Sequence, residues 1–229
     1  LAASGRGAPG AAQLERAVAR LRADGVVAIP RTSSAFPPDL ARLDDAPLLL
    51  LVRGELEALC GPRIAVVGSR APSSYGRAVA ERFAREIAAA GVCVVSGLAT
   101  GIDAVAHRAA LEGGGRTLAV QACGPDLVYP ARHRELASRI ALRGAVLSEL
   151  PPGTPPRPAH FPFRNRLISA LASAVLVVEA RERSGSLVTA RHAADQGVDV
   201  YAVPGPLGAP TSEGTNRLVA PGVLLQNIE

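Results

Sequence analysis

The chain has 229 residues, of which 48% are apolar and 20% charged, which suits one large domain with a buried core and excludes wholesale disorder. Its longest apolar stretch, residues 46–52, is far too short to cross a bilayer, and no secretory pattern is visible, so we expect a cytoplasmic protein without a membrane segment. Cys60, Cys93 and Cys123 are odd in number and lack CxxC spacing, which argues against a disulfide framework and against a zinc site.

The net charge of +5 is unevenly distributed along the chain. Residues 130–166 contain seven arginines and two glutamates, so this segment alone carries the whole excess. A local basic field on an otherwise neutral body indicates a polyanionic partner, either a nucleic acid or a phosphorylated ligand. For residues 131–143 the alternative is a solvated helix face that is merely rich in arginine.

The N-terminal part reads as a small annex. Leu14, Val18 and Leu21 have helical spacing and predict a short amphipathic helix that ends before Gly25. A short strand at residues 26–29 and an irregular, proline-containing connector follow. We therefore expect residues 1–47 to form the remnant of a helical domain with its connector, and residues 48–229 to form the main domain, which opens with an edge strand at residues 48–52.

From residue 63 onward, short apolar runs alternate with amphipathic segments. The expected strands are residues 64–67, 92–95, 117–120, 145–147, 175–178 and 198–203, with one more at 222–225. The expected helices are residues 75–90, 102–111, 132–142, 164–172, 186–196 and 213–219. Strands that are apolar on both faces, each followed by a helix, predict an α/β fold: a doubly wound, mostly parallel Rossmann-like sheet with helices on both faces.

Small and hydroxyl-bearing residues recur where the expected strands end. In such a sheet these carboxyl ends meet at one edge, where ligands bind and where helix N-termini present free N–H groups. Several such loops at one edge predict an extended phosphate-binding surface. Its candidate residues are Gly68, Ser69, Arg70, Gly97, Thr100, Gly101, Ser184, Gly185, Ser186, Gly205, Gly214, Thr215 and Asn216.

Two common nucleotide motifs are absent. No GxGxxG follows the first strand and no acid follows the second, which argues against a dinucleotide cofactor, and the lack of lysine excludes a GxxxxGK[ST] loop. We therefore expect no cofactor.

A second cluster combines cations and aromatic rings. Arg164 and Arg166 flank Asn165 at the start of an expected helix, with Phe161 and Phe163 beside them. Arginines next to an aromatic ring are typical of sites that clamp phosphates while stacking a base. We expect both arginines and Arg70 to contact phosphates, one phenylalanine to anchor the loop in the core, and Phe161 to be the exposed ring.

Asp103 and His107 lie four residues apart on one expected helix and resemble a catalytic pair. We interpret them as structural, because no nucleophile, second base or metal set accompanies them, and we expect no catalytic residue. His133, His160 and His192 are scattered, so a metal site is not expected.

Taken together, several segments resemble the DNA-processing protein A (DprA, or Smf) family in order and spacing. They are residues 64–70 (IAVVGSR), 94–107 (VVSGLATGIDAVAH), 148–154 (SELPPGT), 161–166 (FPFRNR), 179–180 with 184–190 (SGSLVTA) and 202–205 (AVPG). The resemblance runs from about residue 28 to the C-terminus. It implies a protein without enzymatic activity or cofactor that binds single-stranded DNA, loads the recombinase RecA during natural transformation and forms dimers. Against the family pattern, we expect at most a remnant of the N-terminal helical domain, and the given sequence ends where some members continue into a winged-helix domain.

Two other functions remain as alternatives. The LOG family of nucleotide phosphoribohydrolases shares the architecture, but residues 212–216 lack the double glycine and the downstream glutamate of its PGGxGTxxE signature. A purely structural dimerisation module would leave the arginine and glycine clusters unexplained. For the dimer itself, the apolar residues 219–225 predict an edge strand that a second copy would cover, with a monomer as the alternative.

Overall fold

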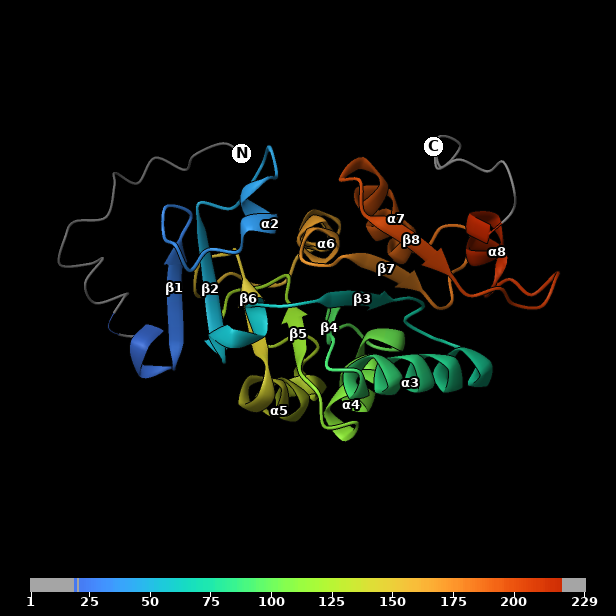
Figure 1. Cartoon of the computed structure of the whole chain (residues 1–229), viewed down its shortest axis with the longest axis horizontal. Helices are drawn as coiled ribbons and strands as arrows, with labels where there is room; N and C mark the ends of the chain where they lie inside the picture. The colour runs from blue at the N-terminus through green and yellow to red at the C-terminus, as the bar shows by residue number, and fades with distance from the viewer. Residues whose placement is uncertain (1–18, 20, 220–229) are drawn as a thin grey trace.

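The computed structural model describes residue 19 and residues 21–219, which form one eight-stranded sheet with helices on both sides (Figure 1). The order in the sheet is β1-β2-β6-β5-β4-β3-β7-β8. Strands β3 to β8 run parallel, whereas β2 pairs antiparallel with both β1 and β6, so the predicted mostly parallel α/β fold is confirmed. The strands are β1 (Val26–Pro30), β2 (Leu49–Gly54), β3 (Arg63–Val67), β4 (Cys93–Ser96), β5 (Thr117–Val120), β6 (Ala145–Ser148), β7 (Ala174–Val177) and β8 (Asp199–Ala202).

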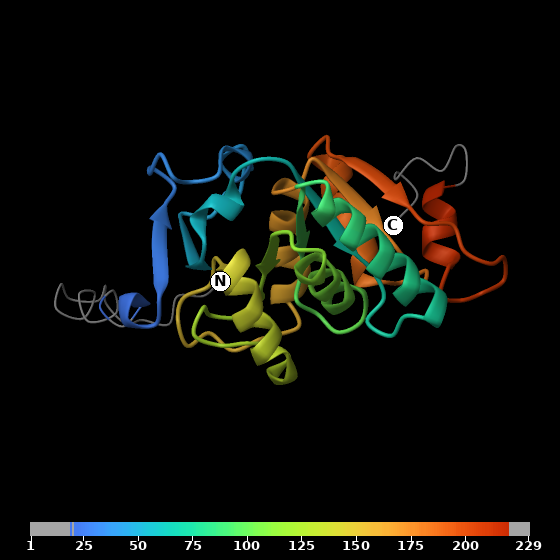
Figure 2. The same ribbon diagram turned by 60° about the horizontal axis from the view of Figure 1, so that its bottom comes forward.

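The helices divide between the two faces of the sheet because the direction of winding reverses once. From β3 the chain winds outward through β4 and β5 to β6, and it then returns to β7 on the other side of β3. With right-handed crossovers, this reversal moves the later helices to the opposite face. Figure 2 shows the first set side by side on one face. That set is α3 (Ser74–Ala89), α4 (Ile102–Glu112) and α5 (Arg134–Arg143); α6 (His160–Ala170) and α7 (Gly185–Asp195) cover the other face, with α2 (Pro38–Ala41) beside α6 and α8 (Glu213–Val219) beside β8.

The central strands are buried on both faces, as their continuous apolar runs predict. In β4, for example, Cys93 and Val95 pack toward α6 and α7, whereas Val94 packs toward α3 and α4. Burying one such aliphatic side chain contributes about 1.5–3 kcal/mol, so these short strands are held mainly by packing on both sides. None of the helices in the described residues is both long and apolar enough to span a membrane.

The expected helix bounds hold to within a few residues, with one exception. The expected start of α6 at Arg164 is wrong, because the helix begins at His160 and includes Pro162 in its first turn. The first N–H groups of a helix have no partner within it, so a proline there removes no helical hydrogen bond. Phe161 and Phe163 therefore lie on a helix and not on a loop.

The expected boundary at residue 47 does not separate two packed units. Strand β1 belongs to the same sheet as β2, and Phe36 and Leu40 of the connector are buried in the main core. Leu21 packs against Val26 and Leu51, as the end of a short N-terminal helix. The positions of Leu14 and Val18, and of the strand expected at residues 222–225, lie outside the described residues.

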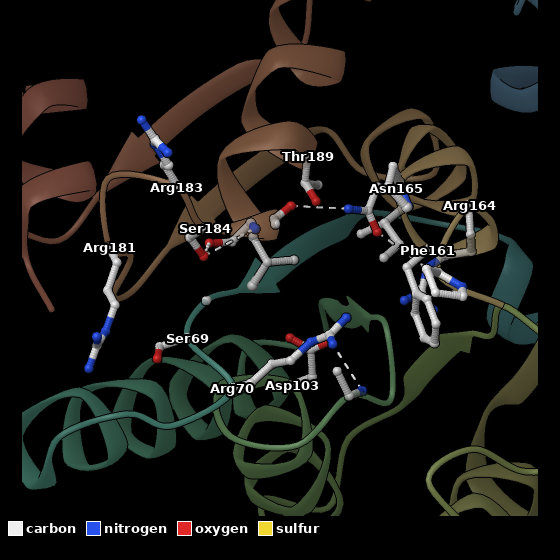
Figure 3. A pocket seen from close by; sticks show the side chains of 18 of the residues that line it. Ser69, Arg70, Asp103, Phe161, Arg164, Asn165, Arg181, Arg183, Ser184 and Thr189 are labelled. Carbon is white, nitrogen blue, oxygen red and sulfur yellow. Dashed lines mark hydrogen bonds between the residues drawn. The ribbon is translucent and has the colours of Figure 1, made fainter. Parts of the chain in front are cut away.

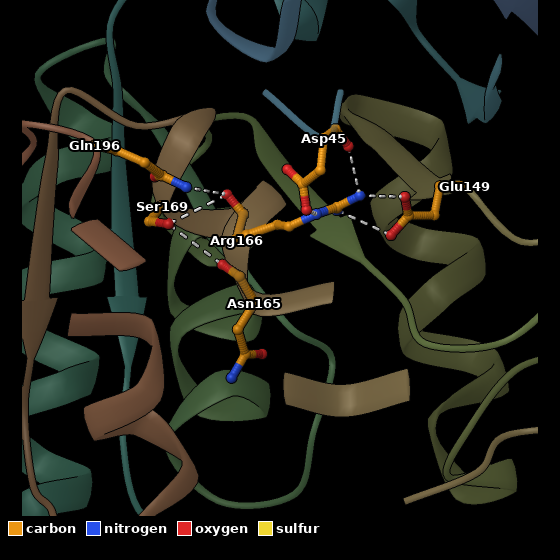
Figure 4. Close-up of polar contacts among 6 residues, drawn as sticks. All are labelled: Asp45, Glu149, Asn165, Arg166, Ser169 and Gln196. Carbon is orange, nitrogen blue, oxygen red and sulfur yellow. Dashed lines mark hydrogen bonds and ion pairs between the residues drawn. The ribbon is translucent and has the colours of Figure 1, made fainter. Parts of the chain in front are cut away.

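Arg166 joins this N-terminal segment to the sheet (Figure 4). Its guanidinium donates to Asp45 at 2.6 Å and to both oxygens of Glu149, which follows β6, at 3.0 and 2.7 Å. The side chain of Arg166 is only 5% exposed and that of Glu149 only 10%. The expectation that Arg166 contacts phosphate is therefore corrected, because its positive charge is already bound to two carboxylates of the protein.

We predict that Arg166→Met lowers the free energy of unfolding by about 3–5 kcal/mol, because Glu149 is left buried without a partner. Arg85→Met removes exposed ion pairs with Glu81 and Glu112 and is the control, with an expected loss below about 1 kcal/mol. Urea denaturation measures both. Adding Glu149→Gln to Arg166→Met should restore part of the stability; equal losses in the single variants and no restoration would contradict the assignment.

His107 is a structural residue of the core, as expected. The hydroxyl of Thr117 donates to the Val94 carbonyl at 2.7 Å, so it has to accept from the Nδ1–H of His107, also at 2.7 Å. The Nε2 atom of His107 is then unprotonated and has no partner among the described residues. Burial, helped by nearby positive charges, lowers the pKa of His107 to about 3.

This depressed pKa predicts acid sensitivity of the fold. Below about pH 6.5 the unfolded chain binds a proton at His107 that the folded chain does not bind, so the free energy of unfolding falls by up to about 1.4 kcal/mol per pH unit. His107→Asn keeps a donor toward Thr117 but does not titrate, and it should flatten this dependence between about pH 6 and pH 4. His192→Asn, on the partly exposed side of α7, is the control and should keep the parent slope. The same slope in all three proteins would refute the assignment.

Candidate nucleic-acid interface

A large cavity lies at the carboxyl ends of β3 and β7, where the winding of the sheet reverses. Open sheets of this type bind ligands at this point. The cavity has a volume of about 680 Å³ and is bounded by the loop after β3, the loop after β7 and the start of α6 (Figure 3). From the predicted set it brings together Gly68, Ser69, Arg70, Phe161, Arg164, Asn165, Ser184, Gly185 and Ser186.

Two of the helix N-termini at this edge are already occupied by carboxylates of the protein. Glu179, just after β7, accepts hydrogen bonds from the N–H and the hydroxyl of Ser73, the N-cap of α3. Asp103, in the first turn of α4, accepts from the N–H groups of Gly97 and Ala99 at 3.1 and 3.3 Å. A negative charge is stabilised at a helix N-terminus, and here the protein supplies that charge itself. A ligand phosphate is therefore excluded from the position after β3 that dinucleotide-binding folds use.

The start of α7 is capped only by the hydroxyl of Ser184, which accepts from the N–H of Ser186 at 3.4 Å. Neither α6 nor α7 has an acidic residue in its first turn. The first N–H groups of α6 bond to the carbonyls of the preceding turn, whereas the N–H of Gly185 has no acceptor among the described residues. A side chain built at Gly185 would meet no atom within 4 Å, so an oxygen from outside has room to approach the backbone. This is the geometry of an anion site.

The floor of the cavity is made rigid by close contacts between two loops. The N–H of Ile102 donates to the carbonyl of Ser69, and the Thr100 hydroxyl donates to the carbonyl of Arg70 at 3.2 Å. Gly101 has a φ of 80°, and a Cβ there would lie 2.2 Å from the Ser69 oxygen, so the contact requires glycine. Gly101 therefore shapes the site from behind without lining it, which corrects its expected role as a direct ligand.

Three arginines of the cavity are exposed. Arg70 lies beneath α6, and Arg181 and Arg183 project from the loop after β7 at the far end (Figure 3). None of the three forms an ion pair with a carboxylate among the described residues, whose ion pairs all lie elsewhere. Arg181 and Arg183 were missed from the sequence because they lie outside the basic segment 130–166.

Arg164 lies in the floor of the cavity and is almost fully buried. Its guanidinium donates to the carbonyls of Gly97 and Val120 and lies beside Asp103. Burial lowers the pKa of Arg164 to about 10 and raises the pKa of Asp103, and the attraction between the two charges opposes both shifts. The expected exposed phosphate clamp is corrected: Arg164 supplies positive charge below the surface and holds the ends of β4 and β5.

The aromatic residues differ from the expectation. Phe161 is half-buried and lines the cavity; the Arg70 guanidinium lies 5.1 Å from its ring centre, and the Tyr129 ring lies 5.6 Å away. Phe163 is the more exposed ring, at 48%, and lies against the Arg166 guanidinium. The expectations of one core phenylalanine and of Phe161 as the exposed one are therefore wrong. Cation–π contact explains both positions, because each ring covers an arginine.

A second, smaller cavity of about 380 Å³ adjoins the first. Arg70, Ala99, Tyr129 and Phe161 line both cavities and form the wall between them. The predicted residues Gly97 and Thr100 line only the smaller one. Tyr129 was not predicted, because an isolated tyrosine after a strand carries no signal of its own.

Six predicted residues line neither cavity: Gly101 and Arg166, described above, and Gly205, Gly214, Thr215 and Asn216. Gly205 is held by the side-chain amide of Asn216, and Gly214 donates to the carbonyl of Ala180. Thr215 is buried and its hydroxyl donates to Ser212. The last four residues attach α8 beside the edge strand β8, so their expected role as phosphate ligands is corrected to a structural one.

Cys123 and the potential metal ligands of the described residues offer neither a reactive thiol nor a metal site. Burial raises the pKa of Cys123 to about 11, so this thiol stays protonated and unreactive at neutral pH. No three His, Cys, Asp or Glu side chains of the described part of the chain lie close enough to hold a metal ion. What the arrangement offers is anion binding next to an aromatic surface.

Comparisons with known proteins identify the family of this chain. The family model of DNA recombination-mediator protein A matches residues 28–227. Protein Smf of Escherichia coli K12 is 49% identical over 198 residues, which are 86% of this chain and 53% of the relative. DNA processing protein DprA of Bacillus subtilis is 41% identical over 211 residues, which are 92% of this chain and 71% of the relative. The chain thus spans about half the length of the first relative and about seven tenths of the second.

Solved structures show the same fold. The X-ray structure of DNA processing protein A from Streptococcus pneumoniae superposes with a TM-score of 0.82 at 40% identity, covering 93% of this chain and 77% of that one. The Helicobacter pylori protein, whose structure concerns its single-stranded DNA binding mode, superposes with a TM-score of 0.77 at 31% identity, covering 88% and 93%. The extent of the sequence match and the shared architecture lead to one assignment: the chain belongs to the DNA recombination-mediator protein A family.

Proposed function

We propose that this chain binds single-stranded DNA with little sequence preference, in the cavity between the ends of β3 and β7. The observation that carries the proposal is the exposed Arg70 against the Phe161 ring, opposite the open N-terminus of α7. The arginine and the Gly185 N–H suit phosphate oxygens, and the ring suits the flat face of a base. These are the two components of sequence-tolerant binding to single strands.

Single strands are favoured over duplex for a geometric reason. A base reaches the Phe161 ring only if it is unstacked from its neighbours, and the bases of a duplex are paired and stacked. Phosphate contacts and stacking carry little information about base identity. The Helicobacter pylori relative, with its single-stranded DNA binding mode, supports the same ligand class for this chain.

The wider role rests on the resemblance to the family. We propose that the protein protects incoming single strands and loads RecA onto them during natural transformation, in the cytoplasm and without a cofactor or catalytic step of its own. RecA filament formation on single strands, measured with and without the protein, tests the loading.

We also propose a homodimer, formed through the C-terminal part of the domain that includes residues 219–225; of these, Val219 is described and exposed. Sedimentation at micromolar concentration tests it, and a species of one chain mass, unchanged by oligo-dT, would exclude the dimer.

The alternative of a nucleotide phosphoribohydrolase has less support. The segment closest to the LOG signature, residues 212–216, packs against the loop after β7 and the edge strand instead of lining either cavity. Incubation with AMP separates the two functions, because release of free base would favour the enzyme.

We predict that Arg70→Ala weakens binding to single-stranded oligonucleotides of every base composition and lowers the salt slope of log K by about 0.7, the value for one phosphate contact on a single strand. Arg85→Ala, an exposed arginine on the far side of α3, is the matched control and should leave both values unchanged. Fluorescence anisotropy at two salt concentrations, with single-stranded and duplex DNA of equal length, provides the data. The proposal fails if the parent binds both forms equally, or if Arg70→Ala binds like the parent with the same slope.

A further inference from the structure

The second cavity is separated from the first by Arg70, Ala99 and the rings of Phe161 and Tyr129. The ring centres lie 5.6 Å apart with a 58° angle between the planes, so the two aromatic surfaces face different directions. Phe161 lines both cavities, and Tyr129 is 47% exposed. An extended ligand that occupies both cavities therefore has to pass over these two aromatic rings.

The far side of the second cavity carries an exposed cation held in a fixed position. Arg132 lies in a short 3-10 helix, Ala131–His133, and forms no ion pair with any described carboxylate. The adjacent His133 is buried, and its Nδ1–H donates to the Leu98 carbonyl at 2.9 Å. Leu98 has a φ of 56°, which is uncommon for a bulky residue, and its side chain is fully buried. His133 thus positions the Arg132 backbone against the loop after β4.

The residues that line this cavity suit a flat group next to an anion. Its remaining walls are Pro130 and four small or short residues, Gly97, Ala99, Thr100 and Ala122, which leave space for a flat group between them and the aromatic wall. The volume of about 380 Å³ holds one nucleotide unit and is too small for a duplex. No acidic side chain lines it, so an anion next to Arg132 meets no repulsion from its walls.

We infer that the second cavity takes one unstacked base of the strand bound in the first, with Tyr129 as the stacking surface and Arg132 as the contact for the next phosphate; this inference rests on the proposed binding of single-stranded DNA. The strand bends around Phe161, with Arg70 at the bend. Base stacking in this cavity and phosphate binding at Arg132 contribute separately to the affinity for the strand. Each contribution can therefore be removed by a substitution that leaves the other in place.

The experiment compares oligo-dT with an abasic oligomer of equal length and charge, because only base contacts distinguish the two ligands. The parent should bind oligo-dT more tightly by about 5- to 150-fold for one stacked base, with more for further bases. Thr100→Leu fills the second cavity and should reduce this ratio by at least about 5-fold relative to Thr100→Val. Thr100→Val is the matched control, because it also loses the hydroxyl bond to Arg70 but adds no length. Tyr129→Leu should act like Thr100→Leu, and Tyr201→Leu, on the edge strand β8, should not.

Arg132→Ala should weaken both oligomers by the same factor and lower the salt slope by about 0.7, with Arg139→Ala on α5 as its control. Thermal unfolding of each variant shows whether it is folded. Failure of the parent to bind either oligomer would refute the proposed function. A parent that binds both while Thr100→Leu and Tyr129→Leu keep its ratio, or an Arg132→Ala that matches Arg139→Ala, would overturn only the second subsite.

Discussion

The site depends on how the protein distributes negative charge over its own helix N-termini. In a doubly wound sheet all these N-termini meet at one edge, and each attracts an anion. Glu179 neutralises the start of α3 and Asp103 the start of α4, both through backbone hydrogen bonds within the protein. The start of α7 remains available. This arrangement leaves the region between α6 and α7, beside Arg70, as the place where we propose that an anion binds.

The arginines divide by burial into two functional classes. Arg164 and Arg166 lie inside the protein, where they bind carbonyls and carboxylates that would otherwise be unpaired. Such buried charges are costly to remove, because each removal leaves another polar group without a partner. Arg70 and Arg132 remain at the surface without carboxylate partners among the described residues. The first class makes the edge of the sheet rigid, and the second is free to contact a ligand.

A rigid edge suits a ligand that is itself flexible. The loop contact at Gly101, the Thr100 hydrogen bond and the His133 contact to Leu98 fix the positions of two cavities and of the aromatic wall between them. A single strand loses conformational freedom when it binds, so a preformed surface avoids a second ordering cost on the protein side. In the binding mode that we propose, the wall of Phe161 and Tyr129 decides where the strand bends.

The spacing of apolar residues and the positions of strand-ending glycines were enough to predict the parallel sheet, most helix bounds and the edge where the candidate site lies. Both features are local signals that can be read from neighbouring residues. The resemblance of residues such as 64–70 and 94–107 to one family was also readable directly. Only the tertiary structure decided which charged groups are used up internally. Arg164, Arg166 and Arg70 look alike in sequence, yet their roles depend on distant partners such as Asp103, Glu149 and Asp45. Ion pairing and burial are properties of residues that the fold brings together from distant parts of the sequence. They cannot be predicted from local composition.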